Sequence, residues 1–176
     1  MLGARFEITR DWRGAPVPAA EHVAVDVVLD DDGVTVLVDA PWHGDAPPGT
    51  APGSTERLWA HEVVEVFLVG KGERYTEIEL GPHGHYLALR LAGARRVIER
   101  HVPVRCATRI DGVRWRGRAT LVRSLVPEPV VAANAYAIHG AGAARRYLAA
   151  HPLPGAVPDF HRLACFPPIV WARDAR

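Results

Sequence analysis

One stretch near the middle of the chain decides the fold: Glu62-Val-Val-Glu-Val-Phe-Leu-Val-Gly-Lys-Gly-Glu-Arg-Tyr-Thr-Glu-Ile-Glu-Leu-Gly-Pro-His-Gly-His-Tyr-Leu-Ala-Leu-Arg-Leu-Ala92. It contains three runs rich in valine, leucine and aromatic residues, at 62–69, 73–80 and 85–92, separated by two short turns that contain glycine. Runs of this length between glycine-containing turns are typical of β-strands joined as hairpins. The stretch therefore predicts three adjacent antiparallel strands.

Strand signals continue on both sides of this stretch. Further strands are predicted at 21–29, 34–39, 95–102, 105–111, 113–122 and 131–139, and Asp30-Asp-Asp-Gly33 predicts a hairpin turn. The segment 41–55 holds four prolines and three glycines and is predicted to be a long surface loop. Only 141–150 has helical propensity, and the proline-rich residues from about 151 onward are predicted to be irregular. The predicted fold class is all-β, an antiparallel β-sandwich of jelly-roll type with at most one short helix, formed as a single domain over residues 1–176.

Composition excludes several classes of protein. The 176 residues carry a formal net charge of +1, which argues against a dedicated nucleic-acid binder. No run of about 18 apolar residues is present to cross a membrane, and no signal peptide is visible, so we expect a cytoplasmic protein with free cysteine thiols. Lys71 is the only lysine among 21 basic residues, a bias that we attribute to a GC-rich bacterial genome. The oligomeric state stays open.

The turn lengths predict how the three central strands pair. A three-residue loop at 70–72 would place Glu65 opposite Glu77, and a four-residue loop at 81–84 would place Leu80 opposite His85. One face then holds the candidate ligand-binding residues, to which the nearby tryptophan is added: Trp59, Glu65, Phe67, Tyr75, Glu77, Glu79, Tyr86 and Arg90. The opposite face is predicted to be the buried one, with Val64, Val66, Leu68, Ile78, Leu80, Leu87 and Leu89.

The glutamates on this predicted face need compensation. Like charges directly opposite each other on a sheet are unfavourable, so an arginine such as Arg90, a shared proton, a cation or a ligand must offset them. Aromatic rings beside carboxylates and a guanidinium are typical of sugar binding, because rings stack on a pyranose while charged groups bind its hydroxyls. We therefore predict a non-catalytic binding domain for a carbohydrate or a similar polar small molecule. The alternative is a structural or protein-interaction domain whose polar face is merely solvated.

A glycoside-active enzyme is a further, less favoured alternative. Glu77 and Glu79 would be about 6.6–6.8 Å apart between Cα atoms, and Glu65 about 5 Å from Glu77, near the separations of glycosidase carboxyl pairs. A sharply raised pKa of one glutamate would favour this alternative. No nucleotide-binding motif, nucleophile elbow or zinc-type histidine spacing is present, and with Met1 as the only methionine, methionine–histidine haem ligation is excluded. We predict no catalytic residue, no metal and no cofactor.

Several segments carry a resemblance to a known family. Leu58-Trp-Ala-His-Glu-Val-Val-Glu-Val-Phe-Leu68 and the strand pair at 75–91 resemble an uncharacterised protein family that includes the product of human chromosome-4 open reading frame 33. Asn134-Ala-Tyr-Ala-Ile-His-Gly140 and Pro158-Asp-Phe-His161 continue the resemblance, which covers roughly residues 20 to 167. That family in turn resembles DOMON-like sandwiches and family 9 carbohydrate-binding modules. The resemblance implies a sugar held between two tryptophans, with Trp42, Trp59 and Trp115 as the candidates.

Overall fold

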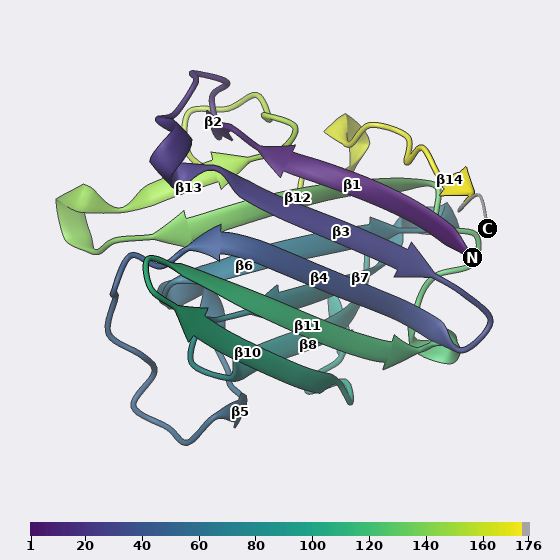
Figure 1. Cartoon of the computed structure of the whole chain (residues 1–176). Coiled ribbons are helices and arrows are strands. Elements are labelled where there is room, and N and C mark those ends of the chain that lie inside the picture. The colour runs from purple at the N-terminus through teal and green to yellow at the C-terminus, as the bar shows by residue number, and fades with distance from the viewer. Residues whose placement is uncertain (174–176) are drawn as a thin grey trace.

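The computed structural model describes residues 1–173, which form two β-sheets packed face to face (Figure 1). The six-stranded sheet has the order β10 (Arg105–Asp111), β11 (Arg114–Val122), β4 (Gly33–Pro41), β3 (Val23–Leu29), β1 (Leu2–Ile8) and β14 (Ala172–Arg173). The eight-stranded sheet has the order β2 (Arg10–Asp11), β13 (Arg146–Ala149), β12 (Ala132–His139), β6 (Val63–Val69), β7 (Arg74–Leu80), β8 (His85–Ala92) and β5 (Gly53–Ser54), and β9 (Val97–Glu99) pairs with β8. The pairing is antiparallel except between β5 and β8. The predicted all-β sandwich is confirmed.

The two sheets differ in how far their strands are buried. In β3 and β4 of the six-stranded sheet, buried and half-exposed residues mostly alternate, because one face packs on the core and the other faces solvent. In β6 every residue is buried, and in β7 every residue after Arg74 is buried. The middle of the eight-stranded sheet is therefore covered on both faces.

Two separate apolar clusters provide this cover. Between the sheets, Val64, Val66, Leu68, Ile78 and Leu80 pack against the valines of the six-stranded sheet. On the outer face of the eight-stranded sheet, a second cluster, which we call the outer cluster, combines strand residues with the C-terminal segment, residues 150–171. Its members are Phe67, Tyr75, Leu87, Leu89, Leu91, Tyr136, Leu153, Phe160 and Phe166. The C-terminal segment thus covers part of the outer face of the eight-stranded sheet, where the glutamates of β6 and β7 lie.

Some elements differ from the predicted ones. The N-terminal strand β1 was not expected, and the strand predicted at 95–102 is only Val97–Glu99. The segment 141–150 is not a helix: Gly140 and Gly142 take positive φ angles of 77° and 55°, and the chain turns back through a 3-10 turn into β13. The helices of the described residues are three-residue 3-10 turns, and none is long enough to span a membrane. They are η1 (Ala19–Glu21), η2 (Leu58–Ala60), η3 (Lys71–Glu73), η4 (Arg123–Leu125), η5 (Gly142–Ala144) and η6 (Leu163–Cys165).

The pairing of β6 with β7 is displaced by two residues from the predicted register. Glu65 lies opposite Glu79 instead of Glu77, and Phe67 lies opposite Glu77. The turn still has three residues, but they are 71–73 instead of 70–72, since the Gly70 N–H donates to the carbonyl of Arg74 around η3. A shift of two residues leaves every side chain on its predicted face, so the glutamates stay together.

The pairing of β7 with β8 is displaced by one residue, and this reverses the predicted face of β8. Leu80 lies opposite Tyr86, because the turn has three residues, with Gly84 at a φ of 83° and the Gly81 N–H bonded to the His85 carbonyl. The prediction that Leu87 and Leu89 lie on the other face of the sheet from the glutamates is wrong: both share the face of the glutamates, in the outer cluster.

Candidate functional site

A cavity of about 320 Å³ opens on the outer face of the eight-stranded sheet, and Glu65 of β6 and Glu77 of β7 contribute to its lining. We call it the glutamate cavity. Its remaining lining comes from η2, from β8 and β9, from β12 and β13, from the arginines that flank β9 and from the C-terminal segment. The cavity therefore lies where the covering segment does not close completely over the sheet.

Three glutamates meet beside this cavity. Glu65 and Glu79 are opposite each other across β6 and β7, and Glu77 is two residues from Glu79 on the same face. One carboxylate oxygen from each lies within 4.8 Å of the others, and the side chains are 3%, 4% and 0% exposed for Glu65, Glu77 and Glu79. Among the described residues, no basic group lies within salt-bridge distance of this glutamate trio.

Burial changes the acid–base properties of the trio. It raises the pKa of Glu77 to about 7, and it raises the pKa values of Glu65 and Glu79 well above the usual range, with the neighbouring carboxylates adding to the effect. Oε2 of Glu77 and both carboxylate oxygens of Glu79 are buried without a hydrogen-bond partner. The trio is a desolvated group of carboxyls whose raised pKa values favour bound protons, and no basic side chain of the described residues pairs with it.

Aromatic side chains also line the cavity. They are Trp59 of η2, which is 38% exposed, Tyr147 of β13 and Phe160 of the C-terminal segment. Phe160 stacks on the buried Tyr136 with ring centroids 3.9 Å apart. Arg145 holds η2 in place by donating hydrogen bonds to the carbonyls of Trp59 and Ala60. A flat ligand in the cavity would therefore meet a partly exposed indole and two further aromatic rings.

Polar groups from distant segments complete the lining. Arg95 forms an ion pair with Asp159 at 2.8 Å, and its main-chain N–H donates to the Tyr75 hydroxyl. That hydroxyl lies 2.7 Å from Nδ1 of His161, and burial, with the nearby Arg95 charge, lowers the pKa of His161 to about 4. His161 is therefore neutral at physiological pH and accepts the Tyr75 proton in this hydrogen bond. Arg100 also lines the cavity.

The structure separates the predicted site residues into three groups. Trp59, Glu65 and Glu77 line the cavity. Glu79, Phe67 and Tyr75 are on the same face but buried among the side chains of the outer cluster and the trio.

The third group, Tyr86 and Arg90, was placed on the wrong face. The one-residue shift of β8 points both away from the glutamates. Arg90 forms an ion pair with Glu99 of β9 at 2.7 Å instead of reaching Glu77, and Tyr86 lines a shallow hollow near Cys106 of β10.

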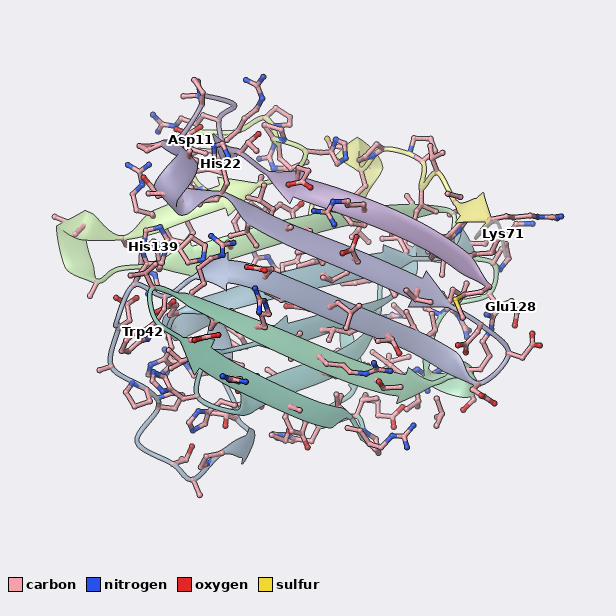
Figure 2. The ribbon with its side chains drawn as sticks, in the orientation of Figure 1. Asp11, His22, Trp42, Lys71, Glu128 and His139 are labelled. Atoms are coloured by element: carbon pink, nitrogen blue, oxygen red, sulfur yellow. The ribbon has the colours of Figure 1, made fainter. Side chains whose placement is uncertain are left out.

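The candidate tryptophans are also separated. Trp115 is buried in the core between the sheets. Trp42 is 38% exposed but does not line the cavity; Figure 2 shows it at the end of the sandwich where His139 lies, far from the end that carries Lys71 and Glu128.

The lining residues that sequence reasoning missed include the polar and aromatic ones Arg95, Arg100, Tyr147, Phe160 and His161. They come from segments with no clear periodicity. One signal was available: if Leu87, Leu89 and Leu91 shared a face with the glutamates, that face would need an apolar cover.

Comparison with known proteins identifies relatives over nearly the whole chain. The mouse UPF0462 protein C4orf33 homolog is 39% identical over 93% of this chain and 89% of its own length. The human protein C4orf33 is 38% identical over 92% and 85%, and the zebrafish homolog 36% identical over 92% and 86%. The bacterial origin that we attributed to the arginine-rich composition is contradicted, because these relatives are animal proteins.

A solved structure shares the fold. A candidate carbohydrate-binding protein from Bacteroides uniformis superposes with a TM-score of 0.70 and 16% identity, over 93% of this chain and 83% of that one. At this identity the likeness shows the fold alone. No family model matches the sequence. The identity and coverage shared with the mouse, human and zebrafish proteins nevertheless show that the chain belongs to the UPF0462 family, the family of C4orf33.

Proposed function

We propose that this protein is a binding domain for a carbohydrate or a similar polar small molecule, and that the ligand occupies the glutamate cavity. The observation that carries the proposal is a concave site of about 320 Å³ in which two carboxyl groups lie beside an exposed tryptophan. Ligand sites in proteins are typically concave, with volumes of about 300–1,000 Å³, mostly apolar walls and a few polar groups. A flat, solvated sheet face would have favoured an interaction domain instead.

The lining has the chemistry that a sugar ring requires. Trp59, Tyr147 and Phe160 offer apolar surfaces to the carbon-bound face of a pyranose. Glu65 and Glu77 can bind hydroxyl groups in either protonation state, since an ionised carboxylate accepts hydrogen bonds and a protonated one also donates. The description of the Bacteroides uniformis protein as a candidate carbohydrate-binding protein is consistent with this proposal.

A glycan array followed by calorimetric titration of the best sugar tests the proposal. Trp59→Ala is the informative variant, and Trp42→Ala is its matched control, because both tryptophans are 38% exposed and only Trp59 lines the cavity. We expect Trp59→Ala to weaken binding about tenfold, which corresponds to the roughly 1.4 kcal/mol of one stacked ring. We expect Trp42→Ala to bind like the unaltered protein.

Two results would contradict the proposal. One is the absence of binding to any sugar on the array, and the other is an equal loss of affinity in both tryptophan variants. The titrated sample is also assayed for newly released reducing sugar, because a carboxyl with a raised pKa, such as Glu77, is what a glycoside-cleaving acid needs. Release of reducing sugar would replace the binding function with the glycoside-active alternative.

A further inference from the structure

No basic side chain of the described residues forms an ion pair with the glutamate trio, so the trio in its ionised form has no direct counter-charge from the protein. The charge of Arg145 acts on Glu65, but its guanidinium donates hydrogen bonds to the main-chain carbonyls of Ala60, Trp59 and Gly140. Arg95, whose charge acts on Glu77, is paired with Asp159. Both arginines are thus engaged elsewhere.

The spacing of the trio suits a single bound cation. One oxygen from each carboxylate lies within 4.8 Å of the others. Calcium–oxygen distances are about 2.3–2.6 Å, so two ligands on opposite sides of one ion are at most about 5 Å apart. An ion between the three side chains can therefore reach all of them while β6 and β7 keep their positions.

An independent observation separates this trio from an ordinary acidic cluster. Glu79 is completely buried, and in the ionised trio neither of its carboxylate oxygens has a hydrogen-bond donor, nor has the buried Oε2 of Glu77. Buried polar atoms of this kind are rare in folded proteins, and an ion is one of the partners that accounts for them. Glu65 and Glu77 line the glutamate cavity, which gives an ion a route from solvent.

We propose that Glu65, Glu77 and Glu79 together bind one hard divalent cation, of the calcium class, next to the glutamate cavity. Three carboxylates supply only oxygen ligands, and an oxygen-only site selects Ca²⁺, Mg²⁺ or Mn²⁺ rather than metals that prefer nitrogen or sulfur. Coordination positions on the cavity side stay open for water or for hydroxyl groups of a ligand. This site departs from the expectation of no metal drawn from the sequence, and it does not depend on sugar binding.

Metal titration of the full chain, stripped of metal with a chelator and free of sugar, tests the proposal. Ca²⁺, Mg²⁺ and Mn²⁺ are added separately, and the bound ion is counted by equilibrium dialysis with elemental analysis. Thermal unfolding is followed in parallel, because an ion that binds only the folded state raises the unfolding temperature. We expect one ion per chain for at least one of the three metals, with a matching rise in unfolding temperature.

Variants locate the ion. Glu79→Gln keeps the size of the side chain and removes its charge, and we expect metal affinity to fall at least about tenfold. Glu62→Gln is the matched control: Glu62 is also buried, at 5% exposure, but it lies outside the trio and accepts hydrogen bonds from the main-chain N–H groups of His43 and Asp45. Glu62→Gln should keep the affinity of the unaltered protein. Glu77→Gln repeats the test if Glu79→Gln does not fold.

Clear results would overturn the proposal. The trio is no metal site if the unaltered protein binds none of the three ions in stoichiometric amount and its unfolding temperature stays constant. Equal affinity in Glu79→Gln and Glu62→Gln would place the ion elsewhere. Because no sugar is present, the absence of metal binding would not contradict the carbohydrate proposal. Likewise, the absence of sugar binding on the glycan array would not contradict the metal proposal.

Discussion

Leu87 of β8 lies directly opposite Glu79 of β7, on the outer face of the eight-stranded sheet. This pairing sets a row of leucines beside the glutamate trio, and the row is covered by the C-terminal segment through Phe160 and Phe166. The cover excludes water from the carboxyls as well as from the leucines. The raised pKa values of the glutamates and the cavity next to them are consequences of this one arrangement.

Replacing Leu87 with alanine should destabilise the protein by about 2–5 kcal/mol, because it removes a fully buried side chain and leaves a space in the outer cluster. Urea unfolding measures the loss. Val122→Ala is the control: Val122 is 57% exposed, so its truncation should change the free energy of unfolding by less than about 0.5 kcal/mol. An equal, small effect of both changes would mean that the outer cluster is not packed.

Gly84→Ala should lower the free energy of unfolding by about 1–2 kcal/mol, because Gly84 has a φ of 83° in the turn that sets the register of β7 and β8. An added Cβ would also lie only 3.2 Å from Cβ of Pro52. Gly49→Ala serves as control, since no atom lies within 4 Å of a Cβ built there. Thermal and urea unfolding of the two variants are compared, and a Gly84→Ala protein as stable as Gly49→Ala would contradict the strained turn.

Asn134→Ala should destabilise the protein by about 1–3 kcal/mol, because the buried amide ties β12 to the start of the C-terminal segment. Its Nδ2 donates to the carbonyl of His151 and to the Tyr136 hydroxyl, both at 2.8 Å, and its Oδ1 accepts from the His151 N–H. Amide hydrogen exchange of the segment near His151 should quicken. Tyr136→Phe removes only one of these hydrogen bonds and should lower the free energy of unfolding less than Asn134→Ala does. A larger loss in Tyr136→Phe would show that the hydrogen bonds to His151 are unimportant for stability.

Acid should weaken the contribution of His161 to stability. Burial lowers the pKa of His161 to about 4 in the folded protein, with Arg95 lowering it and Asp159 raising it, whereas the unfolded chain binds a proton near the ordinary value of 6.5. The unfolded state therefore gains protons first, and the contribution present above pH 6.5 is lost as the pH falls towards 4.

The measurement compares the unaltered protein with His161→Gln, which keeps an acceptor for the Tyr75 hydroxyl but does not titrate. The difference between their free energies of unfolding, measured in urea at several pH values, should shrink from pH 7 to pH 4.5. Taking this difference cancels the contributions of other groups that titrate in the same range. A difference that stays constant with pH would show that His161 is protonated equally in both states.

The sequence by itself determined most of the long strands and the presence of the trio on one face. Valine-rich runs and glycine turns act within a few residues, so they specify local structure without help from distant segments. Glu77 and Glu79 share a face because side chains two residues apart in a strand always do. Glu65 joined them even though the predicted register of β6 was displaced, because a displacement of two residues preserves the face.

Only the tertiary structure decided the face of β8 and the burial of the site. A turn containing Gly84 is compatible with a loop of three or of four residues. This difference of one residue in loop length decides whether the leucines or Tyr86 and Arg90 share the face of the glutamates. His161 and Phe160 reach the cavity from about 80 positions away or more, as the hydrogen bond between Tyr75 and His161, 86 residues apart, illustrates. Contacts between residues so far apart in the sequence depend on the packing of the whole sandwich, because no local preference of the backbone encodes which distant segment will cover a sheet face.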